Sequence, residues 1–268
     1  MNIACLMPTY GRRHLVENAV ACFLAQDHPA ENRRLLILDD LGDLRGEGLG
    51  WRIWSANRYP TLTAKYRTMA AILAERWPAW EAIALMDDDD VYGPHWLSSH
   101  AEALAGRGWS YPARVWSLYG TAPGDRPALE DSGGRFWASA AIRRDLFQTS
   151  GGFQEIARMT FDQEHLARWR SFGGEPGRPD ATCTPQYVYG WGRSNHVSSR
   201  MGRPDWYERH LPMDPRVRGQ GPGARGQGSA CSLSRPAAPP IAPAMDDQTA
   251  GLYAMGIFGQ GKQVVGGM

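Results

Sequence analysis

The stretch Ala82-Ile83-Ala84-Leu85-Met86-Asp87-Asp88-Asp89-Asp90 places four aspartates directly after a short apolar run. The apolar part has the length and composition of a buried strand. Four adjacent carboxylates repel one another, and a divalent cation is the simplest partner that offsets the repulsion, because hard oxygen ligands suit Mg²⁺ or Mn²⁺. A solvated acidic loop that caps the next helix is the alternative. Because the strand directs the aspartates to one edge of a sheet, the pattern favours a metal site.

Two further apolar runs end in polar residues: residues 3–7 precede Pro8-Thr9-Tyr10, and residues 35–38 precede Asp39-Asp40. Helical spacing occurs in residues 12–26, 62–77 and 94–104. A further short strand is expected over residues 51–54. This alternation predicts an α/β fold with a mostly parallel central sheet flanked by helices. Ligands bind beyond the carboxyl ends of strands in such sheets, so we expect the three polar clusters to share one edge.

The second half of the chain is less regular. Residues 136–147 predict a strand that runs into a helix, and residues 160–172 predict another helix with Thr160 as its cap. From residue 219 onward glycine and proline accumulate, which is typical of a flexible linker or tail. We therefore expect one domain over residues 1–218, made of the halves 1–134 and 135–218, and a Gly/Pro-rich tail over residues 219–268.

The composition fits a globular domain, with 43% hydrophobic and 21% charged residues. The four cysteines are widely spaced and form no C-x-x-C pair, which excludes a zinc ribbon and disfavours a disulfide scaffold. The N-terminus lacks the basic segment of a signal peptide, and no apolar run approaches the roughly 18 residues of a membrane span. We expect a cytoplasmic protein with no transmembrane segment.

Several motifs resemble those of GT-A fold glycosyltransferases, most closely glycosyltransferase family 2. Met7-Pro8-Thr9-Tyr10-Gly11-Arg12, Leu36-Ile37-Leu38-Asp39-Asp40 and Leu85-Met86-Asp87-Asp88-Asp89-Asp90 look like the nucleotide-sugar half of that family. Residues 136–147 are similar to its acceptor-side strand, Gly151-Gly152-Phe153-Gln154-Glu155 to its Gly-Gly-Phe-Asp-Glu turn, and residues 161–168 to its Glu-Asp-x-Glu-Leu-x-x-Arg helix. The resemblance covers residues 1–200 and does not reach the tail.

The resemblance implies a metal-dependent, inverting transfer of a sugar from a nucleotide-sugar donor, with a UDP-sugar favoured, to an acceptor hydroxyl. Asp39 or Asp40 would bind the nucleobase. Lys65 either reaches the diphosphate or lies on the solvated face of an amphipathic helix. The full set of residues assigned to the donor is Pro8, Thr9, Tyr10, Arg12, Asp39, Asp40, Lys65, Asp87 and Asp88. The expected activity is therefore that of a hexosyltransferase-type enzyme.

The resemblance also implies the metal ligands and the catalytic base. Asp87 and Asp89 match the two ends of an Asp-x-Asp motif and would hold Mn²⁺ or Mg²⁺, while His196 is either a third ligand or a structural histidine. Asp162 matches the general base that deprotonates the acceptor. Phe161 stands where the family often has Glu, which keeps Glu164 open as the base; we favour Asp162.

The net charge of +1 conceals an uneven distribution. Residues 1–134 contain 13 basic and 17 acidic residues, a net of −4, whereas residues 135–268 contain 16 and 11, a net of +5. Seven arginines lie in the segment 193–225, against three acidic residues. Arginine forks suit phosphate, and a basic segment can follow a nucleic-acid backbone. An anionic acceptor and an arginine-biased solvated surface both explain this pattern.

The family most often glycosylates glycans, lipid-linked molecules or other cell-surface acceptors, and we expect such an acceptor. The alternative is a viral-type enzyme in a host cytoplasm that glycosylates hydroxymethylated bases of phage DNA, reaching them by base flipping. A sugar nucleotidyltransferase is a more remote reading, because residues 5–14 contain a single glycine, Gly11, where a phosphate loop would be glycine-rich. A non-catalytic binding module is the other remote reading, and it predicts no turnover of any donor.

Overall fold

The computed structural model describes residues 1–118, 126–156, 160–181 and 183–190. Two sheets form within these residues. The seven-stranded sheet has the order β3 (Glu47–Gly48), β4 (Trp51–Ser55), β2 (Arg33–Asp39), β1 (Ile3–Thr9), β5 (Ala82–Leu85), β10 (Ala141–Arg143) and β7 (Trp109–Ser110). The four-stranded sheet has the order β6 (Val91–Tyr92), β11 (Tyr187–Tyr189), β8 (Arg114–Ser117) and β9 (Ala128–Asp131). The predicted α/β architecture is confirmed, with β4, β2, β1 and β5 running parallel at its centre.

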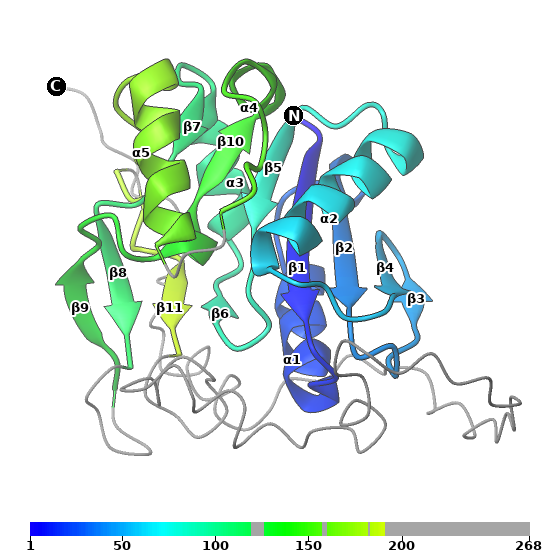
Figure 1. Cartoon of the computed structure of the whole chain (residues 1–268). Coiled ribbons are helices and arrows are strands. Elements are labelled where there is room, and N and C mark those ends of the chain that lie inside the picture. Colours follow the sequence, from blue (N-terminus) through cyan, green and yellow to red (C-terminus); the bar gives the residue numbers. More distant parts are fainter. Residues whose placement is uncertain (119–125, 157–159, 182, 191–268) are drawn as a thin grey trace, which may run out of the picture.

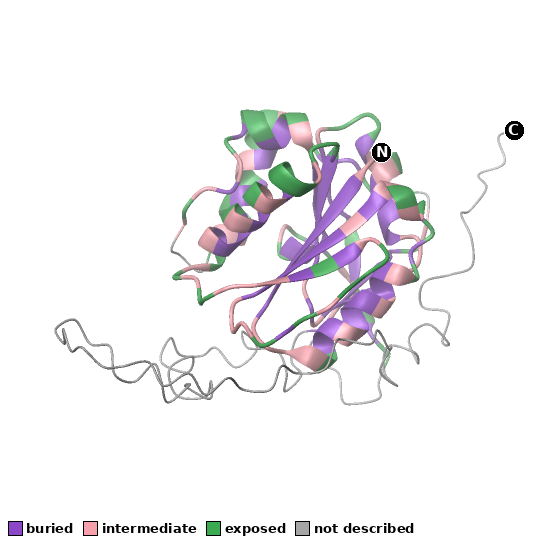
Figure 2. Ribbon diagram, turned by 90° about the vertical axis from the view of Figure 1, so that its right-hand side faces the viewer, coloured by how far each residue is buried: buried purple, intermediate pink, exposed green. Residues whose placement is uncertain are grey.

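Helices cover both faces of the larger sheet (Figure 1). They are α1 (Arg13–Leu24), α2 (Leu62–Arg76), α3 (Trp96–Leu104), α4 (Arg144–Thr149) and α5 (Phe161–Gly173), with short 3₁₀ turns at Ala30–Asn32 and Trp137–Ser139. Alternate residues of β1 separate two cores: Cys5 packs with α1 and α3, whereas Leu6 packs with α2, α4 and α5. Figure 2 shows the resulting buried central strands between partly exposed helices.

Strand β1 continues through Pro8, where the apolar run was expected to stop. Pro8 pairs with Leu38 of β2, but β5 pairs with β1 only as far as Leu6. The carbonyl of Leu6 accepts from the backbone of Met86, and residues two apart on a strand face the same side, so the missing N–H of Pro8 faces a side where β5 has ended. A proline is tolerated at such an unpaired position.

Helix boundaries follow local chemistry. The hydroxyl of Thr61 accepts from the backbone N–H of Ala64 at 3.0 Å and caps α2. Thr160 precedes α5 but makes no side-chain cap; its hydroxyl donates to Glu164 instead. Helix α3 begins at Trp96, two residues beyond the expected start at Pro94. Among the described residues, no helix is long and apolar enough to cross a membrane.

Candidate active site

The loops that follow β1, β2 and β5 meet at the carboxyl edge of the sheet, where the polar clusters were expected. The hydroxyl of Thr9, the last residue of β1, donates to Asp88 at 2.5 Å. The backbone N–H of Gly11 donates to Asp39 at 2.8 Å across the neighbouring strand end. Gly11 has a φ of 64°, a left-handed conformation that glycine adopts without strain and that turns the chain into α1. Hydrogen bonds therefore connect the three clusters into one polar network.

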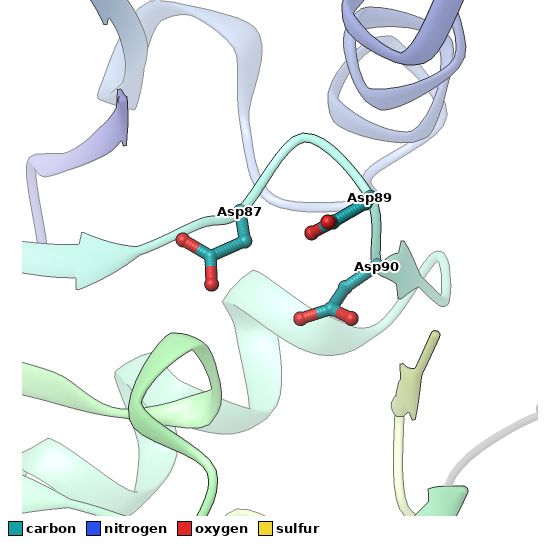
Figure 3. A group of neighbouring side chains, drawn as sticks. All are labelled: Asp87, Asp89 and Asp90. Atoms are coloured by element: carbon teal, nitrogen blue, oxygen red, sulfur yellow. The ribbon is translucent and has the colours of Figure 1, made fainter. Parts of the chain in front are cut away.

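The loop between β5 and β6 gathers three carboxylates. Asp87, Asp89 and Asp90 each offer an oxygen, and these oxygens all lie within 4.8 Å of one another. Figure 3 shows the three side chains on the loop that follows β5, with those of Asp89 and Asp90 extending toward the side of Asp87. Asp88 points away from this group, toward Thr9 and Arg12. The motif predicts Asp87 and Asp89 as metal ligands but does not place Asp90 beside them, because an Asp-x-Asp pattern does not reveal how the turn folds back.

The crowding of these carboxylates changes their protonation. Burial, together with the charges of Asp89 and Asp88, raises the pKa of Asp87 to about 8. Burial also raises the pKa of Asp88 to about 6, although the guanidinium of Arg12 lowers it. Burial likewise places the pKa of Asp90 well above its ordinary value. Perturbed carboxylates of this kind concentrate at functional sites.

Arg12 is the countercharge of this loop. Its guanidinium forms an ion pair with the fully buried carboxylate of Asp88 and a second one with Asp89 at 3.0 Å. Burial opposes the charge of Arg12, but the neighbouring aspartates raise its pKa above the ordinary value. Arg12 thus ties the loop after β1 to the loop after β5, and its position beside Asp89 is compatible with the predicted contact to a donor.

Asp90 connects the carboxylate group to the smaller sheet. The hydroxyl of Tyr187 in β11 donates to Asp90 at 2.5 Å, and the backbone N–H of Gly190 donates to its other oxygen at 2.8 Å. A Cβ at Gly190 would lie 2.2 Å from the backbone oxygen of Asp89, so this close approach requires glycine. The two chain segments are 100 residues apart, and only the fold brings them together.

The aspartates after β2 hold the adjoining loops. The carboxylate of Asp39 is buried and accepts from the backbone N–H groups of Gly11, Leu41 and Leu44. Asp40 accepts from the Nζ of Lys65 at 2.6 Å, and Lys65 also donates to the carbonyl of Thr9. Burial lowers the pKa of Lys65, and the charge of Asp40 partly offsets this effect. The structure therefore places Lys65 within a buried network beneath the surface that a donor would meet.

Pro8 and Tyr10 flank these contacts. Pro8 lies within β1, and Tyr10 is half-buried beside it. The guanidinium of Arg58 stacks over the ring of Tyr10 at 4.9 Å from its centroid. An aromatic ring with a guanidinium on one face is a suitable neighbour for a nucleobase.

The first turn of α5 separates the two candidate bases. Asp162 is half-buried, burial raises its pKa, and its charge contributes to the raised pKa of Asp87. Glu164 is exposed and accepts from the hydroxyl of Thr160 at 2.7 Å. The structure thus places Asp162 on the side of the aspartates and Glu164 toward solvent.

The Gly151–Glu155 turn contacts the start of α2 and so connects the second half of the chain to the first. Glu155 accepts from the hydroxyls of Thr61 and Thr63 at 2.5 and 3.2 Å, and it pairs with Arg67 at 3.3 Å. These contacts hold the segment before α5 against the start of α2. They therefore help to fix the position of Asp162 relative to the strand ends.

Some predictions lie outside the described residues. These are the metal-ligand role of His196, the arginine-rich segment 193–225 with its anionic or DNA acceptor, and the tail 219–268 together with the domain boundary at residue 218. The described residues nevertheless fit a divalent cation by their own chemistry. Three carboxylates converge, and no hydrogen bond to the Asp87 carboxylate occurs in the described part of the chain. Oxygen-rich, anionic sets of this kind suit Mg²⁺ and Mn²⁺.

No protein-family model and no curated protein matches this sequence. Among solved structures, the chain is similar to a fragment of TarS from S. aureus in complex with UDP-GlcNAc, with 14% identity and a TM-score of 0.56, over 78% of this chain and 64% of that one. It is also similar to the mannosyltransferase PcManGT from Pyrobaculum calidifontis in complex with GDP-Man and Mn²⁺, with 17% identity and a TM-score of 0.51, over 74% of this chain and 59% of that one.

The chain thus spans less than two thirds of the length of these solved structures. The structural likeness shows that the fold is that of GT-A-type glycosyltransferases, as the motifs predict.

Proposed function

We propose that this chain is a metal-dependent glycosyltransferase that moves a sugar from a nucleotide-sugar donor to an acceptor hydroxyl. The observation that carries the proposal is the convergence of Asp87, Asp89 and Asp90 at the carboxyl edge of a GT-A sheet. Ligands of such sheets bind at this edge. The printed ligands of two similar structures, UDP-GlcNAc and GDP-Man with Mn²⁺, support a nucleotide-sugar donor and a divalent cation.

The donor would lie over the loops that follow β1 and β2. Asp40 is 12% exposed and Tyr10 is half-buried, so both present surface toward a nucleobase. Asp39 is occupied by three backbone donors and would shape this pocket from beneath. Arg12, already adjacent to Asp89, would donate to the phosphates. We favour a UDP-sugar among the donors.

Asp87, Asp89 and Asp90 would hold the cation. When bound, a divalent cation supplies Lewis-acid stabilisation of the leaving nucleoside diphosphate. Asp162 would accept the proton of the acceptor hydroxyl, whose oxygen then attacks the anomeric carbon while the bond to the diphosphate breaks. A single displacement of this kind inverts the anomeric configuration. The acceptor class we propose is a glycan, a lipid-linked molecule or another cell-surface molecule.

Donor binding and hydrolysis test the proposal. UDP-, GDP- and dTDP-sugars are titrated into the protein with Mn²⁺ or with a chelator, and hydrolysis of each donor is followed. We expect Mn²⁺-dependent binding of at least one donor, loss of this binding in Asp89→Asn, and normal binding in Asp131→Asn. Asp131 is an exposed residue of β9 and gives the matched loss of one negative charge. If no donor binds and none is hydrolysed, with Mn²⁺ or with chelator, the transferase proposal is wrong.

A further inference from the structure

A concave surface lies along the outer edge of the larger sheet, toward the amino-terminal end of β4. It is a groove of about 540 Å³ between the edge strands β3 and β4 and the carboxyl end of α2. Figure 1 shows these two strands beyond β2, with α2 in front of the sheet. Three arginines and three tryptophans contribute to its lining: Arg34, Arg52, Arg76, Trp51, Trp54 and Trp77. The acidic residue of the lining is Glu47. The groove is thus basic and aromatic.

The centre of the groove is a stack of a guanidinium on an indole. The guanidinium of Arg52 lies over the ring of Trp54, 5.2 Å from its centroid. Trp77 meets Trp54 edge-on at 5.8 Å, which fixes the orientation of the stack. The side chain of Arg52 is 59% exposed, so its outer face is the planar surface that a ligand meets. A guanidinium plane of this kind accepts an aromatic base as the next layer.

Two of the three arginines, Arg52 and Arg76, are held loosely enough to exchange partners. Arg52 pairs with Glu47 at 3.5 Å and Arg76 pairs with Glu75 at 3.3 Å, and all four side chains are more than half exposed. Such exposed pairs contribute little to stability. Arg34 donates to three backbone carbonyls through Nη1, which positions its guanidinium at the groove. Guanidinium forks match phosphate oxygens in geometry and charge.

The basic surface continues along β4 toward the carboxyl edge. Arg45 donates to the hydroxyl of Ser55, the last residue of β4, and Arg58 stacks on Tyr10 beside the proposed donor site. The strand from Trp51 to Ser55 is about 13 Å long. Guanidinium groups therefore occur at both ends of β4 and at its centre, and two of them lie on aromatic rings.

We infer that this edge binds single-stranded nucleic acid, with bases stacked on the Arg52–Trp54 pair and phosphates bound by Arg34 and Arg76. A positive groove interleaved with aromatic rings is the arrangement that single strands use. An anionic glycan fits less well, because Arg52 covers the face of Trp54 on which a saturated sugar ring would pack. The inference goes beyond the proposed transfer reaction and does not require a cation or a donor.

Fluorescence anisotropy of a labelled oligothymidine of about 12 nucleotides tests the inference on the full chain. Chelator is present throughout, which separates this binding from the metal-dependent donor site. Two phosphate contacts, from Arg34 and Arg76, predict a slope of about −1.4 for log K against log salt, or roughly a 7-fold loss of affinity between about 50 and 200 mM salt. Arg52→Ala/Arg76→Ala is expected to reduce the slope to about −0.7 and to weaken binding at least about tenfold.

Matched variants separate stacking from charge. Arg52→Lys keeps the charge but loses the plane, and we expect it to bind at least about fivefold more weakly than the unmodified chain. Arg107→Ala/Arg170→Ala removes two exposed arginines elsewhere and is expected to bind normally, as is Asp89→Asn. The inference is overturned if the Arg52/Arg76 double variant binds like this control, if dextran sulfate binds as tightly as the oligonucleotide, or if uridine monophosphate binds as tightly as the strand.

Discussion

Replacing Arg12 by methionine tests whether this residue is the countercharge of the aspartate loop. Removing one partner of a fully buried ion pair costs about 3–5 kcal/mol, because the other charge is left without compensation. Asp88 is completely buried, whereas the side chain of Arg12 retains 25% exposure. The partial exposure places the expected loss at the lower end, about 3 kcal/mol of the free energy of unfolding. In a chain of this size the loss corresponds to a Tm lower by roughly 9 °C.

The loss is expected to depend on pH. Burial raises the pKa of Asp88 to about 6 in the folded protein, above its value in the unfolded chain, although Arg12 lowers it. A folded-state carboxyl with a raised pKa lowers stability as pH rises toward that pKa, because the unfolded chain ionises first. Without Arg12 the pKa of Asp88 rises further, so stability continues to fall at higher pH. The deficit of Arg12→Met is therefore smaller at about pH 5 than at about pH 8.

Urea unfolding followed by tryptophan fluorescence measures the effect, without added metal, at both pH values. Arg13→Met is the matched control, because Arg13 is as exposed as Arg12 but pairs with Glu17 of the same helix at 3.8 Å, and such an i,i+4 pair contributes at most about 0.5 kcal/mol. In the double variant Arg12→Met/Asp88→Asn, we expect at least about 2 kcal/mol of the loss to be recovered relative to additivity. If the Arg12 and Arg13 variants are equally stable, or if the deficit of Arg12→Met does not change with pH, Arg12 is not the countercharge of the aspartate loop.

Three other substitutions test particular contacts. Asp162→Asn is expected to preserve donor binding but to reduce transfer at least about 100-fold, whereas Glu164→Gln is expected to transfer normally; the reverse ranking in a transfer assay would make Glu164 the base. Tyr187→Phe removes the 2.5 Å hydrogen bond to the buried carboxylate of Asp90. We expect denaturant titration to show that the free energy of unfolding falls by about 2 kcal/mol, and a fall of less than about 0.5 kcal/mol would contradict this role. Gly177→Ala places a Cβ 2.1 Å from a carbonyl oxygen of α3, and we expect it to lower the free energy of unfolding by at least about 2 kcal/mol. Gly106→Ala is the control: no atom lies within 4 Å of its added Cβ, and we expect its Tm to be unchanged.

The central strands of the larger sheet could be predicted from the sequence because they carry their own signal, whereas its two-residue strands β3 and β7 were not predicted. Residues 3–7, 35–38 and 82–86 are continuous apolar runs, as expected for strands covered by helices on both faces. The smaller sheet could not be predicted in this way. Its strands contain two to four residues, and β11 pairs with β6 across almost 100 positions. Strands this short are defined by their partners, which a local pattern does not contain.

In the candidate site, too, local sequence predicts some features and only the fold determines the others. The strand-end positions of Asp39, Asp87 and Asp89 follow from the strands that precede them. The sequence does not show that Asp39 accepts three backbone N–H groups, because these donors lie on two different loops. It also does not show that Lys65 points beneath the site, since the periodicity of α2 indicates a buried face but not its neighbour. Contacts between loops therefore decide which predicted polar residues retain exposed surface.

The four consecutive aspartates differ in how the fold compensates their charge. Asp88 has Arg12 and the hydroxyl of Thr9, and Asp90 has the hydroxyl of Tyr187 and a backbone N–H. Asp89 shares the guanidinium of Arg12. The carboxylate of Asp87 accepts no hydrogen bond from the described residues, and its pKa, raised to about 8 by burial and by its neighbours, reflects that lack. A group in this position is stabilised either by a proton or by a cation. Because two further carboxylates face the same space, a divalent cation satisfies all three at once, whereas a proton satisfies one.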